Sequence, residues 1–280
     1  MIERVSWKDA LKGAFKPYLS SNTPVVITDL YTSHPIMSWN VDRLGAVYGE
    51  LVIRVLRSTS QYFFYNETVE REIVQMTLSE FLTRAVYAPG ADGFYYTLGR
   101  SPIDQFEGFS EYMYMPPPFE SILRGFLRMP ERNIWISPFG TRTALHFDAV
   151  ENLNIQVEGS KSFLLFPPMI DGMYPCKWTS QAAYVSTVDP RDPSPVPGFP
   201  YDAQIEVTLV SGEMLYIPYG WWHQVDTVGH TNLNANYWWF PRLKLLSFPQ
   251  QTLRGAAVLI NRKGQHPHKR AQKISNKKEC

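Results

Sequence analysis

The sequence predicts a mainly β fold: a double-stranded β-helix, or jelly roll, with an α/β elaboration on its N-terminal side and flanking helices. Two observations support this prediction. From residue 133 onward, short β-rich runs follow one another with turn residues between them and no helical segment, a pattern typical of β-sandwiches and jelly-roll barrels. The 280-residue chain is also 44% apolar and 14% aromatic, which is enough for one large buried core.

The N-terminal part carries two helix-start signatures. Ser6 precedes Asp9, and Thr77 precedes Glu80, at the three-residue spacing of a capping box. Apolar residues follow both pairs at helical intervals, so we expect helices to begin at Ser6 and Thr77. The other segments expected here are a strand at 23–30, a short helix at 40–50, strands at 51–56 and 93–100, and a proline-led helix at 116–127.

Six runs read as barrel strands. They lie at 133–138, 152–159, 161–168, 205–218, 221–228 and 231–240. Within the fourth run, Gly212 and Glu213 predict a hairpin-like corner. The stretch 188–200 has five prolines in thirteen residues, so we expect an irregular insertion over the barrel there rather than a strand. Loops of this kind often shape a substrate entrance.

Residues 247–262 have the pattern of a final helix. Ser247 suits an N-cap, and Leu253, Ala257 and Ile260 follow at helical spacing. Such an apolar stripe either packs on the domain or pairs with a second subunit, so a homodimer formed through this helix is one expectation. We find no internal repeat and no linker, and we expect residues 1–261 to form a single domain with its barrel core at about 93–240.

The charge is distributed unevenly along the chain. Residues 262–280 carry seven of the 27 basic residues and one of the 26 acidic residues, which leaves a net charge of −5 on the rest. A nucleic-acid-coating surface is therefore not indicated for the body of the protein. We expect the tail itself to be disordered and solvated, with nucleic-acid binding or targeting as the alternative.

The compartment follows from cysteine usage and hydropathy. Cys176 and Cys280 are the only cysteines, so no disulfide framework is implied and a reducing compartment is favoured. The first residues show no signal-peptide pattern, and no run approaches 18 apolar residues. We expect a soluble cytoplasmic protein without a membrane partner, or a nuclear one if the basic tail directs it there.

The tripeptide His146-Phe147-Asp148 opens the β-rich half of the chain. In a strand, His146 and Asp148 share one face while Phe147 points to the other, so both can bind one ion. His223, late in the same strand series, is the candidate third ligand. Two histidines and one carboxylate form the facial triad of non-haem Fe(II) oxygenases. A His-x-Asp tripeptide also arises by chance, and an isolated His223 is more often a hydrogen-bonded core histidine.

These residues resemble a known family. The segments HFDAVENLNIQVEGSKSFLLFPP, GEMLYIPYGWWHQV and NANYWW look like the JmjC, or cupin-8, branch of the Fe(II)- and 2-oxoglutarate-dependent oxygenases. Within that branch the chain is similar to the asparaginyl hydroxylase of hypoxia-inducible factor and to the hydroxylase of tRNA wybutosine synthesis. The likeness is dense over about 93–240 and implies a cupin-like jelly roll.

The resemblance implies the metal ligands and the co-substrate anchor. His146, Asp148 and His223 would bind Fe(II), and Lys161, fifteen residues after the first ligand, would hold the distal carboxylate of 2-oxoglutarate. A dianion in an apolar barrel needs a cation, because an unpaired buried charge is costly. From the residues alone, the alternative for Lys161 is a solvated turn lysine after Gly159.

The resemblance also implies four further co-substrate contacts. Thr143 and Tyr95 would donate hydroxyl groups to 2-oxoglutarate, although Tyr96 adjoins Tyr95 and strand register decides between them. Asn152 and Asn236 would lie near the metal and the 1-carboxylate end of the co-substrate. For both asparagines, a structural hydrogen bond is the alternative role.

The implied reaction is oxidative. With Fe(II), 2-oxoglutarate and O2 are converted to succinate and CO2 while a substrate C–H bond is hydroxylated. The expected acceptor is a protein side chain, a modified tRNA base or a small metabolite. The alternatives are N-methyl demethylation at the same site and a non-oxidative metal-binding cupin. Lys161 argues against the non-oxidative cupin, which needs no buried dicarboxylate anchor.

Overall fold

The computed structural model describes most of the chain up to the final helix. The described residues are 2–30, 34–60, 62–63, 71–88, 93–97, 106–113, 131–180, 182–240 and 244–263. The expected helix at 116–127, the end of the expected strand at 98–100 and the basic tail from residue 264 lie outside these ranges.

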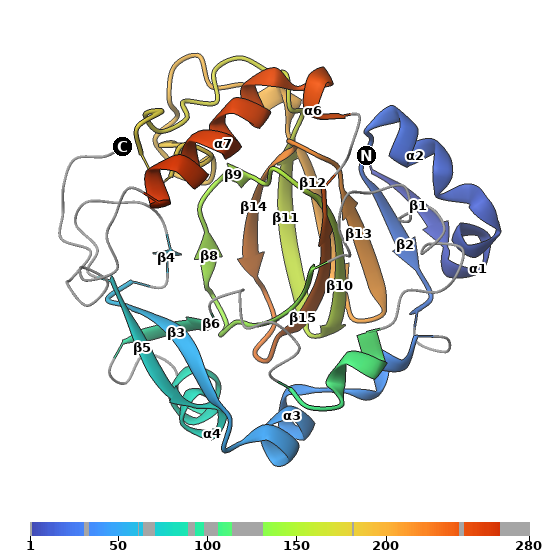
Figure 1. Ribbon diagram of the computed structural model, residues 1–280, viewed down its shortest axis with the longest axis vertical. Helices are drawn as coiled ribbons and strands as arrows, with labels where there is room; N and C mark the ends of the chain where they lie inside the picture. Colours follow the sequence, from blue (N-terminus) through green and yellow to red (C-terminus); the bar gives the residue numbers. More distant parts are fainter. Residues whose placement is uncertain are drawn as a thin grey trace.

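The first of two large sheets has six strands in the order β1-β2-β13-β10-β15-β7 (Figure 1). Its strands are β1 (Glu3–Ser6), β2 (Val25–Thr28), β13 (Glu213–Ile217), β10 (Glu151–Glu158), β15 (Leu233–Trp239) and β7 (Glu131–Ile136). Only β1 and β2 pair in parallel among these strands. The predicted strand at 23–30 is therefore confirmed, and it extends the barrel sheet at its edge.

The second large sheet has the order β12-β11-β14-β8-β4, with β9 also paired to β14. Its strands are β12 (Ile205–Val210), β11 (Ser160–Phe166), β14 (Trp222–Thr227), β8 (Arg142–Thr143), β4 (Tyr62–Phe63) and β9 (His146–Phe147). From β10 to β15 the chain passes repeatedly between the two sheets, and the strands pair almost wholly antiparallel. This arrangement confirms the predicted jelly roll.

Side-chain alternation defines an interior between the two sheets. On β10, Leu153 and Ile155 belong to the core shared with the N-terminal helices, so Asn152 and Asn154 point the other way. On β11, Phe163 and its odd-numbered neighbours pack with apolar residues of β13 and β12. The even-numbered face of β10 and the odd-numbered face of β11 therefore both line the barrel interior.

Two chain reversals differ from a simple hairpin. At Gly159 (φ +75°) the chain leaves β10 and enters β11 in the other sheet. Gly212 (φ +87°) likewise joins β12 and β13, which lie in different sheets. The expected hairpin-like feature at Gly212 is thus a corner between sheets, because the curvature of a jelly roll separates strands that a flat sheet would pair. The proline-rich stretch 188–200 contains no helix or strand, as expected, and η7 (Tyr201–Ala203) follows it directly.

The N-terminal part adds a three-stranded sheet and several helices. The sheet has the order β5-β3-β6, formed by β5 (Arg71–Thr77), β3 (Val52–Ser58) and β6 (Phe94–Thr97). The helical segments are α1 (Trp7–Asp9), η1 (Ala10–Ala14), α2 (Lys16–Ser21), η3 (Pro35–Ser38), α3 (Val41–Tyr48), α4 (Leu78–Phe81), η4 (Leu82–Tyr87) and η6 (Phe109–Met113). The Thr77 capping box is confirmed. Ser6 caps the first helix, but Gly13 (φ 109°) breaks that helix within its second turn.

Two helices end the described chain, α6 (Lys244–Ser247) and α7 (Pro249–Lys263). Helix α7 packs on the barrel through Gln251 and Val258, which are buried, whereas Leu253 and Ile260 of the predicted stripe are 61% and 69% exposed. The face that packs on the domain is therefore not the predicted one. Among the described helices, none is long and apolar enough to cross a membrane.

Candidate metal centre

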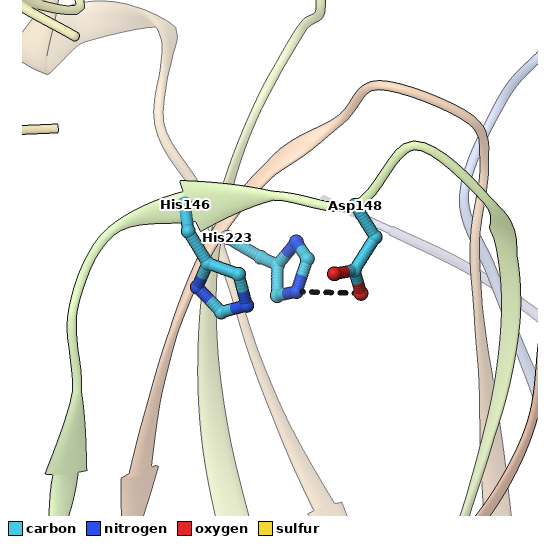
Figure 2. A group of neighbouring side chains, drawn as sticks. All are labelled: His146, Asp148 and His223. Carbon is cyan, nitrogen blue, oxygen red and sulfur yellow. Dashed lines mark ion pairs between the residues drawn. The ribbon is translucent and has the colours of Figure 1, made fainter. Parts of the chain in front are cut away.

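His146, Asp148 and His223 converge at one end of the barrel. One ligand atom from each lies within 4.8 Å of those of the other two, and the His223 Nε2 atom is 3.6 Å from the Asp148 Oδ2 atom. In Figure 2 the three side chains point toward one another, two from β9 and the turn after it and one from β14. His223 and His146 are paired in register across β14 and β9, which brings residues distant in sequence side by side.

The strand alternation expected for the tripeptide is observed. Phe147 is buried on the opposite face, where its ring lies edge-on to Trp222 with the ring centroids 4.8 Å apart. His146 and His223 share the inner face, with their ring centroids 4.2 Å apart. Apolar packing behind the strand thus fixes the direction in which both imidazoles point.

Backbone carbonyls hold both imidazole rings by the same nitrogen. The Nδ1 atom of His146 is 2.7 Å from the Ala144 carbonyl oxygen, and the Nδ1 atom of His223 is 3.0 Å from the Trp221 carbonyl oxygen. A neutral ring that donates from Nδ1 leaves Nε2 with a free lone pair, which is the arrangement found in metal-ligating histidines. Burial, followed by proximity to His146, lowers the pKa of His223 to about 4, so its ring stays neutral at physiological pH.

Lys161 lies in the barrel interior and not in a solvated turn. It sits on the inner face of β11, directly opposite Thr227 of β14, and is only 3% exposed. Within the described part of the chain, no side chain forms a hydrogen bond or ion pair with its ammonium group. Burial lowers the pKa of Lys161 to about 7. A buried amine of this kind is poised to pair with an anionic ligand.

Three of the other expected co-substrate residues also line the interior. The Thr143 hydroxyl accepts a hydrogen bond from the Val225 amide at 3.1 Å, on the same side of the second sheet as His223. Asn152 and Asn236 face it from the first sheet and are 3% and 1% exposed. Asn236 accepts a hydrogen bond from the Asn133 side chain at 3.2 Å, so part of its bonding capacity is already used in the fold.

Tyr95 does not lie with these residues. It is 1% exposed inside the N-terminal core, and its hydroxyl is 3.5 Å from Arg84. Tyr96 points the opposite way, and its ring lies 5.9 Å from that of Trp135 on β7. Strand register on β6 therefore favours Tyr96 over Tyr95 as the hydroxyl nearest the interior.

Several interior polar residues were not singled out from the sequence. Asn154 Oδ1, Asn133 Oδ1 and Trp238 Nε1 are buried and have no hydrogen-bond partner in the described part of the chain, as is also true of Asn152 Oδ1. Buried polar atoms are normally paired, so these atoms indicate space for a polar ligand or water. For Asn154 the sequence offers a signal, the alternating asparagines of "NLN" at 152–154, because alternate strand residues share one face.

The residues present fit a divalent metal ion with a dicarboxylate beside it. Two imidazoles and one carboxylate match the ligand preference of Fe(II). The buried ammonium of Lys161 and the unpaired amide oxygens and indole nitrogen lie on the same interior faces.

The comparisons with known proteins show the family to which the chain belongs. A cupin-like domain model, cupin-8, matches residues 12–244. Lysine-specific demethylase JMJ30 of Arabidopsis thaliana is 30% identical over 241 residues, covering 82% of this chain and 53% of its own. Mouse HSPB1-associated protein 1 is 28% identical (79% and 49% covered), and lysine-specific demethylase 8 of Danio rerio is 27% identical (79% and 54% covered). The chain spans about half the length of these relatives. It thus belongs to the cupin-8, or JmjC, family of cupin-like domains, a family of Fe(II)- and 2-oxoglutarate-dependent oxygenases.

Proposed function

We propose that this protein is an Fe(II)- and 2-oxoglutarate-dependent hydroxylase. Its acceptor would be a C–H bond in a protein side chain, a modified tRNA base or a small metabolite, with succinate and CO2 as co-products. Two features of the barrel interior together carry the proposal. The ligand atoms of His146, Asp148 and His223 lie within 4.8 Å of one another, and the buried Lys161, on the same interior face, has no partner among the described residues.

Each residue of the site would have a separate task. His146, Asp148 and His223 would hold Fe(II) and leave coordination positions for the co-substrates. Bound Fe(II) with 2-oxoglutarate and O2 supplies the oxidising chemistry. Lys161 would pair with the distal carboxylate, which restores the charge that burial disfavours.

Hydroxyl and amide groups would complete the co-substrate pocket. Thr143 and Tyr96 offer hydroxyl groups from opposite sides of the interior, and burial raises the pKa of Tyr96, so its hydroxyl stays a donor. Asn152 would turn its unpaired side chain toward the metal end of the co-substrate. Asn236 would share the same end while it stays bonded to Asn133.

N-methyl demethylation is a second candidate, supported by the names of two relatives. The same site would serve both reactions, because hydroxylation of a methyl carbon on nitrogen gives an unstable hemiaminal that releases formaldehyde. The two outcomes differ in the product, which gains one oxygen in hydroxylation and loses a methyl group in demethylation.

A binding experiment tests the site directly. Anaerobic addition of Fe(II) and then 2-oxoglutarate to the purified protein should give a weak visible charge-transfer band. His146→Ala should abolish the band, whereas His230→Ala, which alters an exposed histidine, should keep it. Absence of the band from the wild type, or its survival in His146→Ala, would overturn the proposal.

The acceptor needs a separate search. Peptides, tRNA nucleosides and metabolites from cells with and without the protein should be compared by mass spectrometry. A species that gains one oxygen only when the active protein is present supports hydroxylation. A species that loses a methyl group, together with formaldehyde release, supports the demethylase candidate instead.

A further inference from the structure

Helix α7 lies across the end of the barrel that carries β9 and β14 (Figure 1). It approaches the barrel closely at Gly255, where an added Cβ would lie 2.7 Å from the Cβ atom of Ala149. Real Cβ atoms do not come this close, so any larger residue at 255 must displace the turn or the helix. Ala149 directly follows the ligand Asp148.

The same helix also contacts the turn before the third ligand. A Cβ at Gly220 (φ +77°) would lie 3.0 Å from the Gln251 Cγ atom, and the Gln251 amide donates a hydrogen bond to the Pro168 carbonyl. The Gly220 amide in turn donates to the Asp148 carbonyl at 3.3 Å. The two turns that carry Asp148 and precede His223 are thus joined to each other beneath α7.

A third set of contacts reaches His146. The Arg254 Nη1 atom donates to the carbonyl oxygens of Cys176 and Ala183, both at 2.9 Å, and its guanidinium lies 4.0 Å from the centre of the Trp178 ring. The Asn261 amide donates to the carbonyls of Trp178 and Ser180. These bonds hold the segment that contains Cys176, Ser180 and Ala183, which has little regular secondary structure.

That segment continues directly into a backbone pairing with β9. The Phe147 amide donates to the Tyr184 carbonyl at 3.1 Å, and the Ser186 amide donates to the Leu145 carbonyl at 2.8 Å. Val185 forms a bridge with His146 itself. The bonds made by Arg254 therefore lie at the start of a chain of contacts that ends at a ligand.

We propose that α7 is a positioning element of the metal centre, in which Gly255 sets the place of Asp148 and Arg254 sets the place of His146. This inference rests on the proposed metal site. Groups around the ligands fix their orientation, and changing such groups typically weakens metal binding by about 10- to 100-fold. A helix packed on the ligand turns would act in the same way without touching the ion.

A complementary pair of substitutions tests the Gly255 contact. Co(II) titration of the full-length protein, followed by its visible absorption, measures metal affinity without turnover. Gly255→Ala should weaken Co(II) binding by about 10-fold, although alanine is the better helix former. Ala149→Gly should restore most of that affinity in the double variant because it removes the clashing methyl group, and alone it should leave binding close to wild type.

Two controls distinguish an effect on the position of the ligands from a loss of the folded structure. Thermal unfolding of each variant without metal shows whether the fold survives, and Arg254→Gln tests the second route if Gly255→Ala fails to fold. Arg254→Gln should also weaken Co(II) binding. Wild-type affinity in folded Gly255→Ala, or in Arg254→Gln, would overturn this inference and leave the proposed function intact. Failure of the wild type to bind Co(II) would instead overturn the proposed function.

Discussion

Lys161 is the residue whose chemistry depends most on its surroundings. The Lys161 residue is only 3% exposed, and its ammonium group has no partner among the described residues. A charge in such a place is costly, which is why burial lowers the pKa of Lys161 to about 7. A carboxylate beside it favours the charged form and raises the pKa again. Binding of 2-oxoglutarate is therefore expected to take up a proton above neutral pH.

This proton uptake should make the affinity for 2-oxoglutarate depend on pH. Below pH 7 Lys161 is charged before and after 2-oxoglutarate binds, so the dissociation constant should not change with pH. Above pH 7 the free protein must first take up a proton, so the dissociation constant should rise by up to about tenfold for each pH unit. Titration of the anaerobic Fe(II) protein with 2-oxoglutarate at several pH values measures this slope.

Lys161→Arg is the matched control, because arginine stays charged throughout this range. The dissociation constant of this variant for 2-oxoglutarate should be independent of pH, whatever its absolute value. A wild-type dissociation constant that is flat between pH 7 and pH 9 would contradict the assigned role of Lys161.

Tyr95 and Tyr96 provide a second test at single-residue resolution. Tyr96→Phe should weaken 2-oxoglutarate binding and leave thermal stability nearly unchanged, because its ring lies beside Trp135 on the interior side. Tyr95→Phe should lower stability by roughly 1 kcal/mol through its lost hydroxyl and leave binding unchanged. Measuring both variants by thermal unfolding and by 2-oxoglutarate titration compares the two assignments, and the reverse pattern would restore Tyr95.

At the scale of elements, the spacing of apolar residues along the sequence was the most informative signal for helices and strands. The barrel strands and the Thr77 capping box are local features, and both were predicted correctly. Strands β1 and β5 were not predicted from the sequence. Strand β1 is short and lies at the edge of its sheet, paired with β2 alone, and β5 gains its conformation from pairing with β3. The choice between Tyr95 and Tyr96 also depends on strand pairing, since the pairing of Leu56 with Tyr96 sets the register of β6.

The corner at Gly159 allows a prediction about an element boundary. Gly159 has φ +75°, and a Cβ there would overlap the Thr231 carbonyl oxygen. Gly108 has nearly the same φ, +76°, but nothing within 4 Å of a Cβ. Gly108→Ala should therefore cost about 1–2 kcal/mol for the left-handed conformation alone, and Gly159→Ala should cost clearly more. Urea unfolding measures both values, and equal losses would show that the Thr231 contact relaxes without cost.

At the scale of the whole molecule, the outer face of α7 is the feature without a described neighbour. Leu253, Leu259 and Ile260 are 61%, 56% and 69% exposed, and apolar residues gathered on one helix face often mark an interface. We therefore keep as a proposal the homodimer expected from the sequence, formed here by the stripe that faces away from the barrel.

A charge substitution tests this proposal. Leu253→Asp combined with Ile260→Asp should shift the protein toward the monomer in sedimentation velocity, because buried carboxylates would oppose association. Val52→Asp is a matched control, since Val52 is 56% exposed on the separate three-stranded sheet. A wild type that sediments as a monomer at all concentrations tested would remove the proposal.

The in-register pairing of His146 with His223 has a consequence for biosynthesis. The first two ligands leave the ribosome long before β14 does, and every strand from β10 to β13 is made in between. A nascent chain therefore cannot assemble the proposed metal site until β14 has been synthesised. Loading of the proposed Fe(II) ion should therefore be a late event in the production of the protein, after every barrel strand up to β14 has left the ribosome.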